Sequence, residues 1–237
     1  EAPSGEMLNP EQLRAVRSES RYAAVTAGPG TGKTKTLVSR ILYLLQEKQV
    51  KPREITAVTF TRKAASELRE RLEKALGGKR RLRNLQIGTF HSVALEALKQ
   101  AGEEVQLAEG MECLELAKET VSLFHLPCSA GKLTGEISRI KSGRDSALIP
   151  REARTYYQKR LEEKGLLDFD DLLLRAAEYF EREDSDRSHF SYLLIDEFQD
   201  CNPAQFRLTE AWNRGGKSLS VIGDPDQSIY GFRGSDS

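Results

Sequence analysis

The chain has 237 residues, and its 36 lysines and arginines are balanced by 36 aspartates and glutamates, so its formal net charge is zero. This balance excludes a globally basic nucleic-acid binder, and any basic surface has to be local. Three widely spaced cysteines, Cys113, Cys128 and Cys201, favour reduced structural thiols over a disulfide framework or a zinc site. The sequence has no apolar run of membrane-spanning length and no signal-peptide pattern at its start, so we expect a soluble, cytoplasmic protein without a membrane partner.

The first predicted strand, Tyr22–Val25, leads into a glycine-rich loop and then an amphipathic helical run containing Leu37, Ile41 and Leu45. Such a loop aims successive backbone N–H groups at one point, and the helix N-terminus adds a partial positive charge there. A lysine after the last glycine suits nucleotide phosphates, and the next threonine suits Mg²⁺. The alternative is a turn that only caps a helix. The predicted phosphate-binding residues are Ala27 (where the general pattern has glycine), Gly28, Pro29, Gly30, Thr31, Gly32, Lys33 and Thr34.

Four further short apolar runs follow, at residues 55–60, 85–88, 192–195 and 219–222. Helical patterns separate most of these runs, which predicts a parallel sheet with helices on its faces and ligands at the carboxyl ends of the strands. Between about 92 and 187 the strand signals vanish and helical patterns dominate. We therefore predict an α/β domain, residues 1–91 and 188–237, with an inserted all-helical subdomain at residues 92–187.

Two acidic residues, Asp196 and Glu197, directly follow the predicted strand 192–195. One acid at such a strand end can bind the Mg²⁺ hydration shell, and the next can orient and deprotonate the attacking water. Gln227 follows the last strand, where a neutral amide can touch the γ-phosphate or this water. The alternative is a pair of solvated loop acids. We predict a catalytic site of Glu197, Asp196, Lys33 and Gln227, with Thr34 and Asp196 as the Mg²⁺-binding residues.

Two segments, 59–65 and 88–92, each follow a predicted strand and begin a helix. Their hydroxyl, N–H and aromatic groups suit a nucleic-acid backbone, although plain helix N-caps explain either segment taken singly. Tyr230 and Phe232 stand beside Arg233, a combination that suits base stacking unless both rings belong to the core. The basic run 79–83 either contacts phosphates or is a solvated connector.

Seven segments in order carry a family resemblance: LNPEQLRAV, AGPGTGKT, TFTRKAASELRERL, IGTFHS, GLLDFDDLL, LLIDEFQD and VIGDPDQSIYGFRG. They extend from Leu8 to Gly234 and together resemble the N-terminal half of a UvrD/Rep/PcrA-type superfamily 1A DNA helicase. The resemblance implies a RecA-like P-loop NTPase domain, called 1A in the family, and an inserted helical subdomain, called 1B. It also implies ATP and Mg²⁺ as cofactors, and single-stranded DNA and its junctions with duplex DNA as partners.

The resemblance assigns roles to individual residues. Gln12 would read adenine, and the phosphate loop with Lys35 would hold the phosphates. Asp196 would bind Mg²⁺ through its hydration shell, Glu197 would be the catalytic base, and Gln227 would sense the γ-phosphate. The residues that would line the single-strand path or link it to the nucleotide are Phe60, Thr61, Thr89, His91, Tyr230, Phe232 and Arg233.

The chain departs from the family pattern at three positions. Lys35 stands where arginine is common, Arg62 where asparagine is usual, and Phe232 where tryptophan is usual. Lysine cannot make the planar two-pronged contacts of arginine, and phenylalanine offers less stacking area than tryptophan.

The resemblance stops at Ser237, shortly after the third motif, so we expect the second RecA-like domain of the family to be missing here. An arginine finger from such a domain contributes about 10³–10⁵ in phosphoryl transfer. The chain by itself is therefore expected to bind nucleotide weakly, with negligible ATP hydrolysis and no unwinding, whereas the whole protein would be an ATP-dependent helicase moving 3′ to 5′. The alternatives are the motor part of an AddA/RecB-like helicase-nuclease and a non-hydrolysing P-loop nucleotide-binding module.

Overall fold

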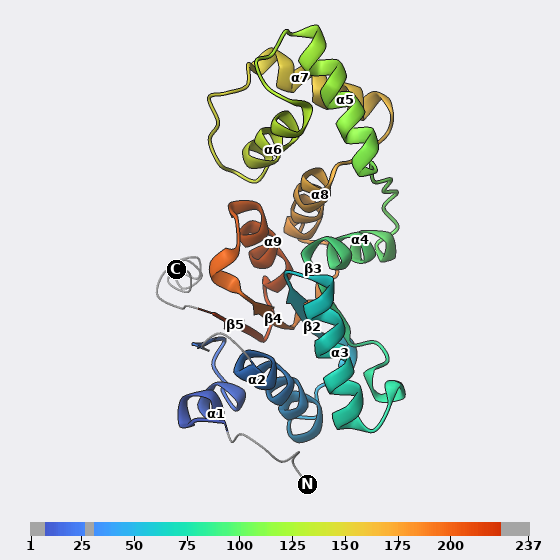
Figure 1. The fold of residues 1–237 in the computed structure, drawn as a ribbon. Helices are drawn as coiled ribbons and strands as arrows, with labels where there is room; N and C mark the ends of the chain where they lie inside the picture. The colour runs from blue at the N-terminus through green and yellow to red at the C-terminus, as the bar shows by residue number, and fades with distance from the viewer. Residues whose placement is uncertain (1–7, 27–30, 224–237) are drawn as a thin grey trace. The chain divides into compact units, whose positions relative to one another are not determined.

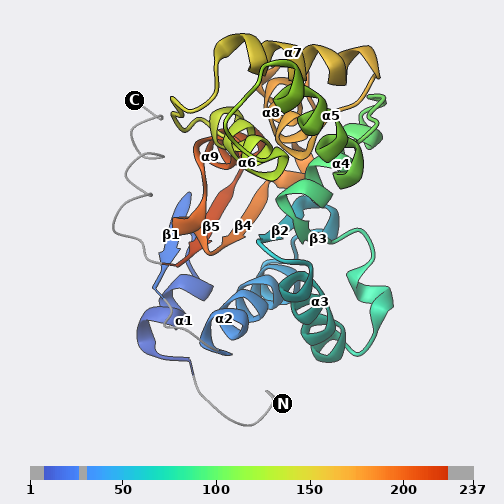
Figure 2. The same ribbon diagram turned by 45° about the horizontal axis from the view of Figure 1, so that its top comes forward.

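The computed structural model describes residues 8–26 and 31–223, and these form a sheet of five strands with helices between them (Figures 1 and 2). The strands are β1 Tyr22–Val25, β2 Ile55–Thr59, β3 Gln86–Thr89, β4 Tyr192–Asp196 and β5 Ser218–Ile222. Their order across the sheet is β1-β5-β4-β2-β3, and every neighbouring pair is parallel. All carboxyl ends therefore meet at one edge of the sheet and all amino ends at the other. The predicted parallel sheet, built from the five predicted runs, is confirmed.

The helices of the described residues are α1 Pro10–Val16, α2 Thr31–Leu42, α3 Arg62–Leu76, α4 Phe90–Gln100, α5 Gly110–Leu123, α6 Ala130–Lys141, α7 Arg151–Glu163, α8 Phe169–Glu181 and α9 Pro203–Asn213. None of these helices is long and apolar enough to cross a membrane. The chain divides into two compact units. The sheet unit comprises the described residues within Glu1–Val93, Asp186–Cys201 and Trp212–Ser237, and the helical unit comprises Ala94–Ser185 and Asn202–Ala211.

The main core of the sheet unit lies between the sheet and two helices, α2 and α3, which Figure 2 shows side by side below the strands. Apolar residues recur every three or four positions on each helix, which gives each one a single buried face. Leu68 and Leu72 of α3 and Ile41 of α2 are fully buried against strand residues such as Ile55 and Leu194. Each buried aliphatic side chain stabilises the fold by about 1.5–3 kcal/mol, so this interface fixes both helices on the sheet.

A stack of aromatic rings forms a second core in the sheet unit. Phe190 and Trp212 stack with their centroids 4.7 Å apart, and Phe90 stacks near Trp212 at 6.1 Å. Phe60, the residue after β2, meets Phe90 edge-to-face at 5.6 Å. Offset and edge-to-face contacts of this kind add about 0.5–1.5 kcal/mol each beyond area burial. The stack therefore holds the end of β2 next to the start of α4.

The helical unit has its own core, in which Leu116 of α5, Leu133 and Ile137 of α6, and Tyr157 and Leu161 of α7 are buried together. Residues 92–187, all of them described and predicted from the sequence to be helical, contain helices and no strand, so this prediction is confirmed.

A polar network joins α6 to α8 within this unit. Lys141 Nζ lies 2.6 Å from Asp168 Oδ2 and 3.1 Å from Asp171 Oδ1. Asp168 also caps α8 by accepting the Asp171 N–H at 2.8 Å. One ammonium group thus pairs with two carboxylates, and all three side chains have little access to solvent. Removing one partner would leave a buried charge unpaired, so the network is costly to break.

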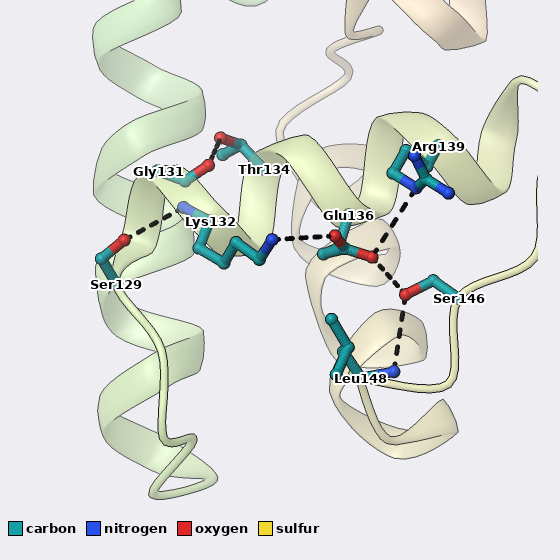
Figure 3. Close-up of polar contacts among 8 residues, drawn as sticks. All are labelled: Ser129, Gly131, Lys132, Thr134, Glu136, Arg139, Ser146 and Leu148. Carbon is teal, nitrogen blue, oxygen red and sulfur yellow. Dashed lines mark hydrogen bonds and ion pairs between the residues drawn. The ribbon is translucent and has the colours of Figure 1, made fainter.

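Glu136 of α6 is a second polar anchor in the helical unit (Figure 3). Its side chain is 8 % exposed and contacts Lys132 Nζ at 3.3 Å, Arg139 Nε at 4.0 Å and the Ser146 hydroxyl. The Ser146 hydroxyl oxygen in turn accepts the Leu148 N–H at 3.5 Å. The hydrogen bond from Ser146 is the main reason why the pKa of Glu136 is lowered. This carboxylate therefore ties the loop after α6 back to the helix.

Residues 202–211, which the sequence-based division placed in the second part of domain 1A, pack with the helical unit. The Ala204 N–H donates to the Ser142 carbonyl at 3.2 Å, and Arg207 pairs with both carboxylate oxygens of Glu181 at 2.6 and 2.8 Å. Gly143, at φ +93°, has no room for a Cβ, since that atom would lie 2.8 Å from Pro203 Cβ. These contacts attach most of α9 to α6 and α8.

Candidate functional site

The carboxyl edge of the sheet brings together residues from four separate stretches of sequence, those that follow β2, β3, β4 and β5. Ligands of open parallel sheets bind in the crevice outside this edge. At this edge β4 is followed by Glu197, β5 by Gly223, β2 by Phe60 and Thr61, and β3 by Phe90 and His91.

Lys33 and Glu197 meet at the centre of this edge. Lys33 lies in the first turn of α2, and its ammonium group forms an ion pair with Glu197 Oε1. The two side chains are 16 % and 30 % exposed, so solvent weakens this pair less than a surface pair. The structure therefore joins the lysine of the predicted phosphate loop to the predicted catalytic base.

Glu197 is held in a strained backbone conformation. Its φ and ψ angles are +52° and +41°, a left-handed region that non-glycine residues seldom occupy. This bend reverses the chain after β4 and begins a 3-10 turn, Phe198–Asp200. Through that turn Gln199 Nε2 reaches back to Glu197 Oε2 at 2.6 Å. Each carboxylate oxygen of Glu197 thus has its own donor.

Asp196, the last residue of β4, is oriented by its neighbour: its Oδ1 accepts the Glu197 N–H at 2.8 Å. Burial raises the pKa of Asp196 above the ordinary aspartate value, and the Glu197 charge adds to this effect. The Glu197 N–H and Lys33 act in the opposite direction. A cation bound beside Asp196 would therefore stabilise its charged form.

Gly223, which follows β5, is in close contact with the side chain of Gln199. Its φ is +147°, its N–H donates to the Val25 carbonyl at 3.0 Å, and a Cβ there would fall on Gln199 Oε1 and 2.9 Å from Gln199 Cδ. Gln199 therefore lies between the carboxylate of Glu197 and the backbone at the end of β5. Gln199 lies in the segment LLIDEFQD, and the sequence alone predicted no role for it. The available signal was its spacing, two positions after Glu197.

Gln12 lies beside the start of α2, and its Nε2 is 3.6 Å from the position that a Cβ on Gly32 would take. Its Oε1 accepts the Asn9 N–H at 3.0 Å, and Asn9 Oδ1 accepts the Gln12 N–H at 2.7 Å, forming a capping box on α1. The predicted adenine reader is therefore next to the phosphate loop with one amide atom engaged in a cap. Thr34 and Lys35 lie half-buried in the first turn of α2.

Four predicted DNA-contacting residues gather where β2 and β3, which are neighbours, both end. Thr61 accepts the Ala64 N–H at 3.0 Å and so caps α3. Thr89 accepts the Ser92 N–H at 3.2 Å at the start of α4. Each threonine thus has the capping role that the sequence left as the simpler alternative, and Thr61, which is exposed, keeps a hydroxyl hydrogen to donate. Burial lowers the pKa of His91, which favours its neutral form.

Several predicted site residues lie outside the described part of the chain: Ala27, Gly28, Pro29, Gly30, Gln227, Tyr230, Phe232 and Arg233. Thr31 begins α2, and its side chain is likewise outside the description.

A parallel sheet with Lys33 at the start of the helix after β1 and an acidic pair after β4 defines a RecA-like nucleotide-binding domain. The sequence comparisons agree. The model of the UvrD/REP helicase N-terminal domain matches residues 8–142 and 136–237. The chain therefore belongs to the UvrD/Rep helicase family.

Three relatives are each named ATP-dependent DNA helicase PcrA. The Staphylococcus aureus (strain Mu50) protein is 33 % identical over 254 residues, covering 97 % of this chain and 34 % of the relative. The Leuconostoc citreum protein is 32 % identical over 252 residues, covering 96 % and 34 %. The Staphylococcus epidermidis protein is 33 % identical over 254 residues, covering 97 % and 35 %. The chain thus spans about a third of the length of these relatives.

Proposed function

We propose that the chain is the ATP-binding part of a DNA helicase that uses ATP hydrolysis to move along single-stranded DNA. The observation that carries the proposal is the Lys33–Glu197 pair at the carboxyl edge, next to the ends of β2 and β3. Coupling requires a nucleotide site and a strand site close enough for one to respond to the other, and neighbouring strand ends of one sheet meet this need.

The proposed binding step exchanges partners at Lys33. A triphosphate carries several negative charges, so it competes with Glu197 for the lysine ammonium group. When Lys33 moves to the phosphates, Glu197 loses one donor and keeps Gln199 as the other. Nucleotide binding would thereby release the base for its reaction and leave it oriented.

Thr34 and Asp196 offer hydroxyl and carboxylate oxygens, the donors that Mg²⁺ prefers, so this pair fits the metal that accompanies ATP. Bound there, Mg²⁺ would offset negative charge on the phosphates. Water attacks the γ-phosphorus, the bond to the bridging oxygen breaks with its electron pair leaving on ADP, and Glu197 takes the water proton. Gln227 would report the state of the γ-phosphate to the strand path.

On the DNA side, Phe60, Thr61, Thr89 and His91 would contact the strand, with Tyr230, Phe232 and Arg233. Stacking on aromatic rings is tolerant of sequence, so little base preference is expected. The helical unit would act at the junction of single- and double-stranded DNA, and movement would run 3′ to 5′. A helicase-nuclease motor and a non-hydrolysing nucleotide-binding module remain the competing functions.

ATP hydrolysis measured with and without single-stranded DNA tests the proposal. The whole gene product should hydrolyse ATP faster when oligo-dT is added, and the 237-residue chain alone should bind ATP weakly with negligible turnover. A whole gene product that binds ATP without any turnover would favour the non-hydrolysing module. Nuclease activity that depends on ATP would favour the helicase-nuclease.

A further inference from the structure

The amino edge of the sheet, opposite the nucleotide edge, carries a cluster of exposed cations. Two short turns precede the neighbouring strands β2 and β3, at Pro52–Glu54 and Lys79–Leu82. Six exposed basic side chains belong to these turns and the residues beside them: Lys51, Arg53, Lys79, Arg80, Arg81 and Arg83. We call these six residues the amino-edge cluster.

Fixed contacts hold the starts of β2 and β3 together and attach each turn to the rest of the sheet unit. Leu82 and Leu85 are 4 % and 5 % exposed and anchor the second turn in the core. Thr56 Oγ1 lies 3.1 Å from Gln86 Oε1, at the start of β3, and donates to the His189 carbonyl at 2.7 Å. His189 Nδ1 lies 2.7 Å from the Arg53 carbonyl. The cations therefore project from a rigid edge, so a ligand that they bind gains from their preorganisation.

The charge of the cluster is only partly offset within the part of the chain that the structure describes, where Asp186 interacts electrostatically with Arg53. Among residues 8–26 and 31–223, no carboxylate lies within ion-pair distance of any of the six. The nearby Glu54 is engaged by Lys217 at 3.6 Å and by the Lys51 N–H at 3.4 Å. The six like charges repel one another, and a polyanion laid across them would relieve that repulsion.

The positive charge of the sheet unit does not extend to the helical unit. The helical unit has 14 lysines and arginines against 20 aspartates and glutamates in its sequence. Because the whole chain is neutral, the sheet unit carries a net positive charge. The amino-edge cluster contains the densest exposed run of basic residues in this unit, at positions 79–83.

The absence of apolar groups favours a nucleic acid over an acidic protein. Protein interfaces gain most of their affinity from buried aromatic or aliphatic anchors. In the described part of the chain the exposed large apolar side chains are Leu13, Met111, Leu123, Leu148 and Phe169, and none is in either turn. Protein–DNA interfaces are instead polar and strongly positive, and arginine, four of the six here, suits phosphate geometry.

We propose that the amino-edge cluster is a second DNA-binding surface, which contacts the phosphate backbone of duplex DNA without reading its sequence. It lies on the edge of the sheet opposite the nucleotide and strand site, so the two surfaces act on different parts of the DNA. The surface does not depend on ATP hydrolysis, and its test is separate from the test of the helicase function.

The test measures binding of a blunt-ended 20-base-pair duplex by fluorescence anisotropy between 50 and 200 mM KCl. The test variant is Lys79→Gln with Arg80→Gln and Arg81→Gln. The matched control is Arg14→Gln with Arg17→Gln and Lys48→Gln, three exposed cations of the sheet unit outside both turns. The test variant should bind at least about tenfold more weakly at 50 mM KCl, and the slope of log affinity against log salt should shrink by about 2.7, three contacts at 0.9 each. The control should keep both values.

Lys51→Gln with Arg53→Gln provides a second variant on the other turn and should shrink the slope by about 1.8. Thermal unfolding checks that all variants fold. We expect them to fold because the replaced side chains are exposed. Unchanged duplex binding in both amino-edge variants would overturn the proposal, as would an equal loss in the control. Polyglutamate serves as a second ligand in the same assay and stands for an acidic protein. If the amino-edge variants lose polyglutamate binding but keep duplex binding, the proposal is overturned and the partner is an acidic protein.

Discussion

Lys33 and Glu197 are separated by 164 positions in the sequence, and they form an ion pair at the carboxyl edge of the sheet. The pair joins the lysine of the predicted phosphate loop to the predicted catalytic base. A lysine in this position neutralises the carboxylate until a more highly charged ligand replaces it. If Glu197 is the base, the pair would make its availability depend on nucleotide binding, as we propose.

Replacing Lys33 by alanine should abolish ATP turnover while leaving the fold intact. The substitution removes the cation that balances the phosphates, and loss of one such group in a preorganised site costs a factor of about 10²–10³. Steady-state hydrolysis by the whole gene product measures the loss, and circular dichroism melting checks the fold. Lys48→Ala is the matched control, because Lys48 pairs with Glu19 at the surface. Turnover within twofold of the parent protein would refute the role of Lys33.

Replacing Glu197 by glutamine should keep ATP binding and stop hydrolysis. Glutamine retains the shape and an acceptor oxygen for Gln199, yet it cannot take the proton of the attacking water. The affinity for ATP should stay the same or rise, because Lys33 no longer has a carboxylate partner. Equilibrium binding of a fluorescent ATP analogue and single-turnover hydrolysis separate the two effects. Glu70→Gln, on the exposed side of α3, serves as the control. Retained hydrolysis would show that another group is the base.

Replacing Gln199 by alanine should lower kcat about tenfold with little change in the KM for ATP. Gln199 donates to Glu197 at 2.6 Å, so the variant leaves the base in place without the donor that orients it. A merely structural role would lower the melting temperature instead and leave kcat of the folded fraction unchanged. Comparison of kcat, KM and melting temperature decides between these roles.

The contact between Gln199 and Gly223 gives a second test of the same role. Gly223→Ala places a Cβ where Gln199 now lies, so it should displace the glutamine and lower kcat as Gln199→Ala does. The control is Gly215→Ala, which also has a positive φ, +71°, with no atom near the new Cβ. If Gly223→Ala acts through Gln199, adding it to Gln199→Ala should lower kcat by much less than the product of the two single effects.

The sequence predicted those features that local patterns encode. The alternation of apolar runs and helical patterns gave the parallel sheet, and the order of the runs placed Lys33, Asp196 and Glu197 at one edge. The role of Gln199 was missed because it depends on the left-handed backbone of Glu197, which no propensity for glutamate predicts. The packing of residues 202–211 with the helical unit is likewise not encoded by local patterns, since it rests on contacts such as Arg207 with Glu181 that tertiary packing creates.

The hydroxyls of Thr61 and Thr89 illustrate a different limit. A threonine at the start of a helix suits both a cap and a phosphate contact, and the sequence cannot separate two roles that need the same group at the same place. The structure identifies the caps, at 3.0 and 3.2 Å, and the DNA contact stays a prediction.

Asp170, in the first turn of α8, should make the stability of the protein depend on pH. Burial raises the pKa of this carboxyl from 3.8 to about 6, against the effect of a hydrogen bond from Ser138. The folded state therefore binds a proton more tightly than the unfolded state between about pH 4 and pH 6. In that window the unfolded state carries fewer protons, so the free energy of unfolding falls as the pH rises and stays lower above pH 6.

Asp170→Asn removes this titration and keeps an acceptor for Ser138. The variant should be more stable than the parent at pH 8, by about 1 kcal/mol once partial exposure to solvent is allowed for, and should show no gain at pH 4. Urea unfolding at pH 4, 6 and 8 measures the difference, with Asp145→Asn, at an exposed loop position, as the control. An equal gain at pH 4 and pH 8 would assign the effect to packing, because only the charged form of Asp170 carries the cost of burial.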